Sequence, residues 1–442
     1  MKSILNCLIS AISFIAYINN DAMAFTISNQ KGVGYSVRSR NVNSLSILSA
    51  RRDNRIQQHC EDVSSIIKQT ATLLCSVALM FNVHVGSVDA AVAPLADVGL
   101  REFLVKDGKE LLRLSIPSTL PQTSNAEKVG DWGRSLQEHT ELVRLRLEQV
   151  GFSGKTAVWS ACLKEVNAAK SDLVKVDGSA EEKTNIGNKL DELANALRKQ
   201  DIVDTLKLQE DAAAAVGDLR LASLVPGELP FEIPNDYKDL PRLKGRTTVQ
   251  CVLSKNNGGS FRLEDGTQSK AATLLLVIDG YHAPITGGNF VDLVQRGFYD
   301  GMKLKAEGEL LVESQDIDFV DPKTREVRQL PLELFYKRDS SPVYEYTSDE
   351  DMRATEGFSL PFQAYGALGM EHDPENVNTA SSKFWFLRWD QALVSPGRNT
   401  IDGSHTCFGY VVNSQDLLKQ ISSGDKIESM KVISGASNLI KA

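Results

Sequence analysis

Apolar residues recur at steps of three and four between residues 100 and 221, a stretch rich in Ala, Leu, Glu, Lys and Arg. This period predicts amphipathic helices. The three longest stripes are Trp132, Leu136, Val143, Leu147 and Val150; Trp159, Leu163, Val166, Ala169 and Leu173; and Ile186, Leu190, Leu193 and Leu197. A shorter stripe covers 202–221, and 103–114 predicts a leading helix. Because one stripe buries only part of a helix, we expect an antiparallel helical bundle over 94–222, with Trp132 and Trp159 in its core.

Four prolines then interrupt the pattern, and they predict a junction at 223–245 that continues no helix. They are Pro226, Pro230, Pro234 and Pro241. Apolar residues lie among them, including Phe231 and Tyr237, so we expect this junction to be held against a surface rather than to form a loose tether.

From Thr247 the period changes to that of strands, at 247–254, 272–279, 408–412 and 426–433, with helices expected at 286–296 and 414–421. This order predicts an antiparallel β-barrel capped by helices, and thus an α+β chain. A long insert at 317–361 contains Leu330, Leu332, Leu334 and Tyr336 in strand-like alternation and an acidic tip at 348–352. It is either a solvated loop or a partner contact.

Two further apolar segments precede the predicted bundle. Residues 4–18 follow Lys2 and end before Ala22-Met23-Ala24, and residues 70–83 end before a second A-x-A sequence at 91–93. The segment between them, 25–58, is serine-rich and carries six basic residues against one acid. Both apolar segments are short for a membrane span.

We interpret 1–24 as a signal peptide, 25–69 as a plastid transit region and 70–93 as a thylakoid-transfer segment, which together predict delivery to the thylakoid lumen. Phe25, directly after the first cleavage site, resembles the bipartite presequences of diatoms and other algae with secondary plastids. The alternative is a secreted protein whose second apolar segment is a core helix or an anchor.

Composition narrows the function further. Cleavage after Ala93 would remove eight of 49 basic and five of 57 acidic residues, which leaves a formal charge of −11. A protein this acidic is a poor candidate for nucleic-acid binding. Cys162, Cys251 and Cys407 would remain, and their scattered positions predict buried thiols, with a redox pair as the alternative. No metal-binding or phosphate-binding spacing occurs, so neither a metal nor a cofactor is expected.

Four motifs carry a resemblance to a known family. They are 287–316 (GGNFVDLVQRGFYDGMKLKAEGELLVESQD), 366–372 (GALGMEH), 382–387 (SKFWFL) and 401–409 (IDGSHTCFG). In this order they are similar to the cyclophilins, which are peptidyl-prolyl cis-trans isomerases, or rotamases, over roughly 246–442. Residues 230–246 and 277–302 resemble more closely the large thylakoid-lumen cyclophilins of plants and algae, which place a helical domain before the barrel. That subfamily is associated with assembly and maintenance of photosystem II.

The resemblance implies an apolar pocket for a proline ring, formed here by Met370, Trp385, Ile401 and His405. The polar positions depart from the family. Ala306 replaces the catalytic arginine, Leu310 a phenylalanine, Glu313 a glutamine, Glu371 a small residue, His372 an asparagine and Thr400 a tryptophan. A shift of one residue would bring Lys305 to the arginine's place, but strand alternation is expected to point Lys305 to the other face.

These departures predict weak or absent turnover. Isomerisation must lower a barrier of about 18–20 kcal/mol that arises from amide resonance, and loss of one transition-state donor typically costs on the order of a hundredfold to a thousandfold. We therefore expect a lumenal folding factor, or chaperone, that binds proline-containing segments, with photosystem II subunits among its partners. The alternatives are an active isomerase in which another residue replaces the arginine, and a non-catalytic scaffold that acts through the bundle.

Overall fold

The computed structural model describes residues 24–28, 36–40, 105, 107–118, 131–148, 156–225, 227–308, 310–388 and 401–441. The chain divides into two compact units, 1–92 and 93–442. In the first, β1 (Ala24–Ser28) pairs antiparallel with β2 (Ser36–Arg40). Apart from this hairpin, the predicted presequence segments lie outside the described residues.

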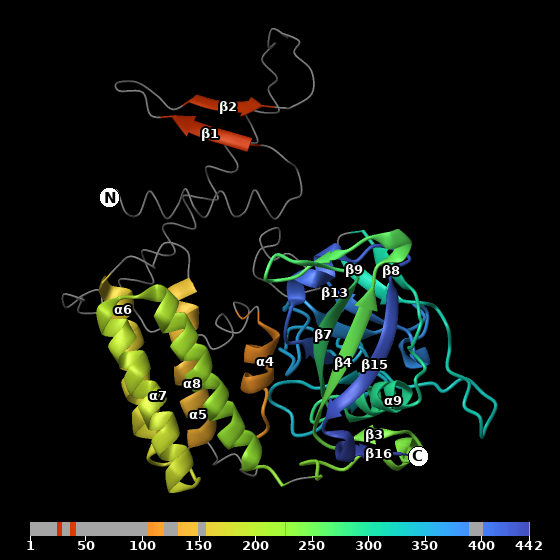
Figure 1. The fold of residues 1–442 in the computed structure, drawn as a ribbon, viewed down its shortest axis with the longest axis horizontal. Coiled ribbons are helices and arrows are strands. Elements are labelled where there is room, and N and C mark those ends of the chain that lie inside the picture. Colours follow the sequence, from red (N-terminus) through yellow and green to blue (C-terminus); the bar gives the residue numbers. More distant parts are fainter. Residues whose placement is uncertain are drawn as a thin grey trace, which may run out of the picture. The chain divides into compact units, whose positions relative to one another are not determined.

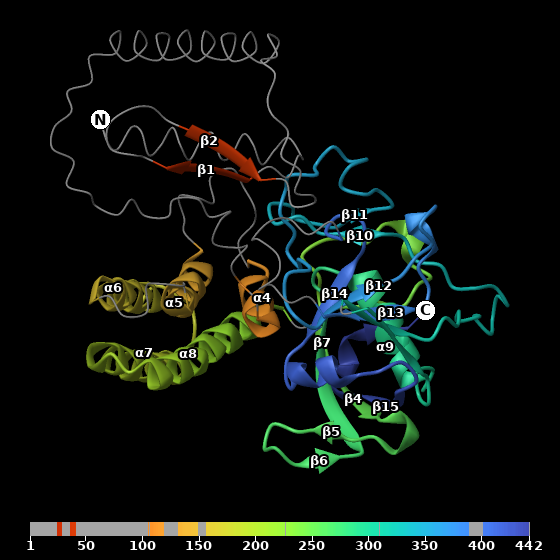
Figure 2. The same ribbon diagram turned by 90° about the horizontal axis from the view of Figure 1, so that it is seen from above.

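Four helices form the predicted antiparallel bundle in the second unit (Figure 2). They are α5 (Trp132–Glu148), α6 (Thr156–Leu173), α7 (Ala180–Lys199) and α8 (Ile202–Ala222). Helix α5 packs against α6 and α8, and α7 packs against the same two helices. The predicted stripes supply the buried core, which includes Leu136, Val143, Trp159, Cys162, Val166, Ile186, Leu190 and Leu193.

Local sequence fixes where these helices begin. Ser179 and Glu182 form a reciprocal capping box at the start of α7, and the carboxylate of Asp201 accepts from two backbone N–H groups at the start of α8. The prediction that Trp132 is a core residue is wrong. It is the first residue of α5 and is 39% exposed, and the ammonium of Lys175 lies 3.7 Å from the centre of its ring.

Eight antiparallel strands form the barrel, in the order β15-β4-β7-β14-β12-β13-β9-β8. Figure 1 and Figure 2 together label all of these strands. In chain order they are β4 (Arg246–Ser254), β7 (Ala271–Asp279), β8 (Leu304–Glu307), β9 (Leu311–Ser314), β12 (Ala367–Met370), β13 (Phe384–Leu387), β14 (Cys407–Val411) and β15 (Lys426–Ser434). Alternate residues of β4 and β7 are buried, as their period predicts.

Backbone hydrogen bonds close the sheet between its two outermost strands. Gly301 N donates to Ile427 O at 2.7 Å, Ile427 N donates to Met302 O at 2.8 Å, and Leu304 N donates to Asp425 O at 2.7 Å. Helix α9 (Pro284–Gln295) packs against β15, β7 and β14, and its Phe290 is buried in the barrel core against the rings of Tyr299, Phe384 and Phe408. The second predicted helix, at 414–421, is instead the 3-10 helix η6 (Gln415–Gln420).

Two-stranded sheets and short 3-10 helices complete this unit. The strand pairs are β3 (Arg242–Leu243) with β16 (Leu439–Ile440), β5 (Phe261–Arg262) with β6 (Gln268–Ser269), and β10 (Glu333–Leu334) with β11 (Val343–Tyr344). The 3-10 helices are η2 (Asn235–Tyr237), η3 (Asn256–Gly258), η4 (Val377–Thr379) and η7 (Ala436–Asn438).

The proline-rich junction contacts the insert. Tyr237 donates to Glu345 at 2.6 Å, its ring lies 5.0 Å from that of Tyr344, and Phe231 lies 5.8 Å from Phe335. The predicted alternation in the insert buries Leu330, Leu332, Leu334 and Tyr336, although only β10 and β11 are regular strand. The junction is therefore held against a surface, as predicted, and that surface includes the insert and the barrel core, against which Ile233, Tyr237 and Leu240 pack.

Helix α4 (Gly108–Leu114), shorter than the predicted leading helix, contacts α5 and α8 of the bundle and β14 of the barrel. On the bundle side, Arg113 forms ion pairs with Glu141 and Glu210. On the barrel side, Gly108 lies so close to Tyr410 that an added Cβ atom would be 2.7 Å from the Cβ of Tyr410. Helix α4 thus bridges bundle and barrel.

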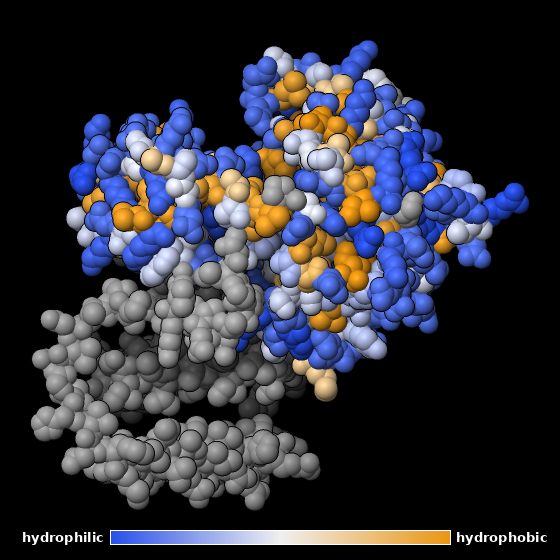
Figure 3. All heavy atoms as spheres, turned by 90° about the horizontal axis from the view of Figure 1, so that it is seen from below, coloured by the Kyte–Doolittle hydropathy of each residue, from blue (hydrophilic) through white to orange (hydrophobic). Residues whose placement is uncertain are grey.

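The surface mixes hydrophilic side chains with separate groups of hydrophobic ones, as one face of the molecule shows (Figure 3). Among the helices that the structure describes, none has the length and apolar character needed to span a membrane.

Candidate functional site

Strand register sorts the predicted site residues between two faces of the sheet. Residues directly opposite each other on neighbouring antiparallel strands project to the same face. Lys305 on β8 lies opposite Glu313 on β9, Glu313 lies opposite Trp385 on β13, and Trp385 lies opposite Gly369 on β12. We call these four residues the outer row.

The adjacent row faces the barrel interior. It consists of Ala306, Val312, Phe386 and Leu368. Of these, Val312, Phe386 and Leu368 are fully buried in the barrel core. Ala306 therefore belongs to the interior row, away from Trp385.

The expectation that alternation turns Lys305 away from the pocket face is thus wrong. Ala306 is the residue that alternation turns away. The register across the tight turn between β8 and β9, where Glu307 lies opposite Leu311, places Lys305 on the face of Glu313.

Glu313 lies between two lysines. Its side chain is 9% exposed, and the Nζ atoms of Lys305 and Lys383 each lie 3.8 Å from Glu313 Oε2. The Lys305 side chain is 61% exposed and that of Lys383 is 22% exposed. Water screens the Lys305 contact, so we expect it to contribute under about 1 kcal/mol to stability. The outer row therefore carries a cation beside the carboxylate that lies opposite its aromatic residue.

Trp385 is the largest side chain of the row and is 1% exposed. Gly369 makes room for it, because an added Cβ atom at Gly369 would collide with the indole ring. The ring of Phe362 lies 4.9 Å from the indole, and His405 meets it edge-on at 5.8 Å. Within the described ranges, the indole N–H has no hydrogen-bond acceptor.

Two predicted pocket histidines stack on each other. The rings of His372 and His405 are 4.3 Å apart and nearly parallel, at 28°. His372 Nε2 lies 2.8 Å from Ser404 O, and His405 Nδ1 lies 3.0 Å from Ser404 Oγ. Burial, and to a smaller extent the neighbouring His372, lowers the pKa of His405 to about 4. His405 is therefore a neutral ring near neutral pH.

The other predicted site residues do not gather around Trp385. Met370 lies opposite Phe384 and belongs to the barrel core, so it is not on the face of Trp385. Leu310 is 59% exposed in the turn after β8, and Ile401 is partly buried against the cluster that contains Trp385. Glu371 is partly exposed and its N–H donates to Lys383 O at 2.9 Å. Thr400 lies outside the described residues.

Covering this face is an apolar cluster built from three parts of the chain. Val105, Leu111 and Leu112 come from the α4 segment, Leu360 and Phe362 from the segment before β12, and Trp385 and Tyr410 from the barrel. Tyr410 donates to Pro361 O at 2.8 Å, and Phe362 N donates to Asp402 Oδ1 at 2.7 Å. The aromatic end of the outer row is therefore closed.

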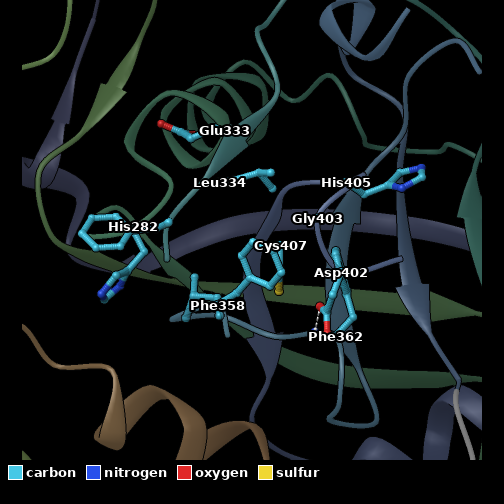
Figure 4. A pocket seen from close by; sticks show the side chains of 11 residues that line it. His282, Glu333, Leu334, Phe358, Phe362, Asp402, Gly403, His405 and Cys407 are labelled. Atoms are coloured by element: carbon cyan, nitrogen blue, oxygen red, sulfur yellow. Dashed lines mark hydrogen bonds between the residues drawn. The ribbon is translucent and has the colours of Figure 1, made fainter. Parts of the chain in front are cut away.

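A small cavity of about 20 Å³, room for one water molecule, lies beside this cluster and is lined by Glu333, Phe358, Phe362, Asp402 and His405, among others (Figure 4). The carboxylate of Glu333 accepts from Ile285 N at 3.2 Å and from Thr286 N at 3.0 Å, at the start of α9. Burial raises the pKa of Glu333 to about 7, although these hydrogen bonds oppose the rise.

The three cysteines of the second unit are buried and unpaired, as predicted. Burial raises the pKa of each thiol. Among the residues with described positions, no group of three or more His, Cys, Asp or Glu side chains is arranged to hold a metal ion.

Comparison with known proteins decides the family. Residues 265–436 match the family described as cyclophilin type peptidyl-prolyl cis-trans isomerase/CLD. The putative thylakoid lumen peptidyl-prolyl cis-trans isomerase sll0408 of Synechocystis is 34% identical over 355 residues, which cover 76% of this chain and 84% of that protein. The chain belongs to the cyclophilin family.

Two chloroplastic cyclophilins of Arabidopsis thaliana are also similar. CYP38 is 31% identical over 380 residues, covering 82% of each chain, and CYP37 is 36% identical over 255 residues, covering 57% of this chain and 52% of that one. The crystal structure of cyclophilin AquaCyp293 from Hirschia baltica aligns with 46% of this chain and 82% of its own at 13% identity and a TM-score of 0.27. The lumenal and chloroplastic relatives place this cyclophilin in the thylakoid lumen of a plastid, as its presequence predicts.

The sequence analysis assigned Lys305 to the wrong face, and it missed Lys383, Gly369 and Phe362. A tight β8–β9 hairpin pairs residues at equal distances from its turn. Counting back from Glu313 would therefore have placed Lys305 opposite it, on the same face of the sheet. Gly369 and Phe362 gave no comparable signal, since their importance comes from contact with Trp385.

Proposed function

We propose that this cyclophilin is a folding factor of the thylakoid lumen that binds proline-containing segments of other proteins, with weak or absent isomerase turnover. The observation that carries the proposal is the state of the outer row. Its aromatic residue, Trp385, is covered by Phe362, and its polar end holds a lysine beside a carboxylate instead of an arginine. A lysine lacks the rigid planar fork of a guanidinium.

The retained apolar surface supports the binding part of the proposal. When the covering cluster is displaced, Trp385 and the neutral ring of His405 would offer a flat, largely uncharged surface of the kind that packs against a proline ring. Because Trp385 is covered, a client segment must first displace part of the apolar cluster, and this cost opposes both binding and turnover.

We further propose that the clients include subunits of photosystem II during assembly or maintenance. The support is the resemblance of residues 230–246 and 277–302 to the lumenal subfamily associated with that complex, together with the lumenal location.

NMR of a peptide with a single Phe-Pro bond tests binding and turnover in one sample, with residues 94–442 as the protein. We expect chemical-shift changes that report binding, and cis-trans exchange close to the uncatalysed rate. His405→Ala should weaken binding, whereas His139→Ala in the bundle should not. Ordinary cyclophilin turnover would refute the weak-turnover part, and absence of binding to any such peptide would refute the folding-factor part.

An active isomerase is the second candidate, and the position of Lys305 favours it. The same NMR experiment separates the two candidates, because only an active isomerase produces exchange cross-peaks well above those of the free peptide.

A further inference from the structure

We propose that His139 forms a proton-operated latch between helices α5 and α6, which is closed when the imidazole is protonated and loosened when it is neutral. The inference is independent of the proposed function, because the latch lies in the bundle whereas the candidate site lies in the barrel. It gives this protein a bundle whose strength depends on pH.

His139 of α5 lies between two carboxylates of α6, the helix beside it (Figure 2). Its Nδ1 atom lies 2.7 Å from Glu165 Oε2, and its Nε2 atom lies 3.9 Å from Asp172 Oδ2. The side chain of His139 is 31% exposed, whereas those of Glu165 and Asp172 are 13% and 9% exposed. The ring can therefore exchange protons with water, although its two partners are largely shielded from water.

Protonation changes which contacts this ring can make. A neutral imidazole has one N–H donor and one acceptor nitrogen, whereas an imidazolium has two donors. In the neutral form, a proton on Nδ1 serves Glu165 and leaves the Nε2 lone pair facing the carboxylate of Asp172, which is a repulsive arrangement. In the protonated form, both ring nitrogens carry hydrogen and face a carboxylate of α6. Protonation therefore replaces a repulsive contact between the two helices with an attractive one.

Other side chains of α5 hold the two carboxylates in position. Arg146 donates to Glu165 Oε1 at 2.5 Å and 3.1 Å, so Oε2 of the same carboxylate is left for His139. Ser135 donates to Asp172 Oδ2 at 2.6 Å. Among the side-chain types in this cluster, histidine is the one whose charge ordinarily changes between pH 5 and 8. The latch is thus a preformed frame with one titrating member.

The charges around the ring favour its protonated form. Glu138 precedes it on α5, and Glu165 and Asp172 face it from α6, where Asp172 also accepts from Lys175 at 3.2 Å. The hydrogen bond to Glu165 is the largest cause that raises the pKa of His139 above its ordinary value of 6.5, and partial burial opposes the rise.

Helices α4 and α8 also pack against α5, and their charges contact other residues of it. Arg113 of α4 pairs with Glu141, and Glu210 of α8 pairs with Arg144. Glu141 follows His139 by two residues, which is about 200° around a helix. These charges therefore lie across α5 from the imidazole.

The raised pKa fixes the sign of the pH effect. Because the folded state holds the proton of His139 more tightly than the unfolded chain does, the latch contributes stability that is fully present below pH 6.5. This stability is lost as pH rises through the folded pKa. Glu165 sets the lower limit, since hydrogen bonds to His139 and Arg146 hold its pKa below the ordinary value of 4.5. We therefore expect the latch to be closed between pH 4.5 and pH 6.5.

The experiment combines an NMR titration with hydrogen-deuterium exchange, both on residues 94–442. The ring of His139 should titrate above pH 6.5, and Glu165→Gln should lower its midpoint by about one unit or more. Peptides from α5 and α6 should be several-fold more protected at pH 5.5 than at pH 8, after correction for the intrinsic exchange rates. The titration uses the wild-type protein, so it decides the question even where a variant does not fold.

Three variants separate the latch from a merely structural contact. His139→Gln keeps a donor for Glu165 but does not titrate, so it should remove the pH dependence. His139→Arg carries a permanent charge and should give at pH 8 the protection that wild type shows at pH 5.5. Lys170→Gln, the matched control, removes an ion pair between α6 and Asp191 of α7 and should leave the ratio of protection at the two pH values unchanged.

The inference is overturned if the ring of His139 titrates at or below pH 6.5, or if the pH dependence of α5 and α6 persists in His139→Gln. It is also overturned if Lys170→Gln abolishes that dependence to the same extent. Each of these outcomes concerns the bundle alone, so the proposed binding of proline-containing segments stands or falls by its own test.

Discussion

At the scale of single residues, Trp385 and Gly369 form a matched pair. The indole covers Gly369 so closely that any side chain there would collide with it, and Phe362 packs against the same ring. A larger aromatic residue on β13 is therefore compatible with this sheet only because its neighbour on β12 has no side chain.

We predict that Gly369→Ala destabilises the protein by roughly 1–3 kcal/mol, the usual cost of overpacking a filled core. Trp385→Phe should recover much of this loss when it is combined with Gly369→Ala, because the smaller ring leaves room for a methyl group. Urea unfolding of the single and double variants measures the coupling. Equal stability of wild type and Gly369→Ala would contradict the close contact.

At the scale of elements, the insert supplies the cap that helix α9 lacks. Ala283, at the N-cap position of α9, has no capping side chain, and Glu333 of β10 accepts from the N–H groups of Ile285 and Thr286 instead. The N–H of Glu333 in turn donates to Thr406 Oγ1 at 2.9 Å, next to His405. Through its carboxylate and its backbone N–H, Glu333 thus joins the insert, the helix and the candidate site.

We predict that this carboxylate makes stability depend on pH. The pKa of Glu333 is raised from 4.5 to about 7 in the folded protein. Between these values the folded state holds a proton that the unfolded state has released, so stability rises as pH falls from 8 towards 5. The contribution is at most about 3 kcal/mol.

Glu333→Gln should flatten that part of the stability curve, as measured by urea unfolding at pH 5, 6, 7 and 8. The exposed Glu326→Gln in the same insert is the control and should leave the slope unchanged. An identical slope in wild type and Glu333→Gln would show that Glu333 titrates as it does in the unfolded chain.

The elements also show how far sequence could predict this structure. Helical stripes and alternating strands gave the bundle and the barrel because burial follows the period of each element. Trp132 was misplaced since a stripe does not reveal that its first residue lies at the end of the bundle. The region 414–421 became a 3-10 helix, a distinction that apolar spacing alone does not make.

The candidate site was harder to predict than the fold. His405 contacts both Trp385 and His372, as the motifs predicted. These residues lie in or next to β12, β13 and β14, which are neighbours in the sheet. The error at Ala306 arose at one hairpin, where a one-residue difference exchanges the two faces of a strand. Met370 was placed in the pocket by its motif, although the strand turns it into the core. Which face a residue takes depends on pairing with strands distant in sequence.

At the scale of the whole second unit, helix α4 connects bundle and barrel through its last turn and the residues that follow. Arg220 of α8 donates to Arg113 O and to Ile116 O, each at 2.8 Å. Arg246 of β4 donates to Leu112 O at 2.6 Å and also pairs with the buried Asp279. One arginine from each domain thus donates to neighbouring backbone carbonyl groups of the same short segment, 112–116.

Arg113 adds the charged part of the contact with the bundle. Its guanidinium pairs with Glu141 and Glu210, and its side chain is 10% exposed. Burial, reinforced by the nearby Glu141, raises the pKa of Glu110 to about 9, which keeps that carboxyl neutral near pH 7. Arg113 therefore compensates the buried charge on Glu141, and its loss would leave that charge without its partner in the ion pair.

We predict that Arg113→Ala destabilises the bundle by about 3–5 kcal/mol, the usual cost of breaking a buried ion pair from one side. Because α4 contacts the barrel mainly through Leu111, Leu112 and neighbouring apolar residues, the barrel should keep its own stability. Hydrogen-deuterium exchange with mass spectrometry distinguishes the two parts: peptides from α5 and α8 should exchange faster in Arg113→Ala, whereas peptides from β4 and β7 should not. Lys199→Ala, which removes an exposed charge at the end of α7, is the control.

The contradicting outcome is a loss of protection in β4 and β7 to the same extent as in α5 and α8. Bundle and barrel would then unfold as one cooperative unit, and α4 would be part of a continuous structure rather than a bridge between two separately stable domains.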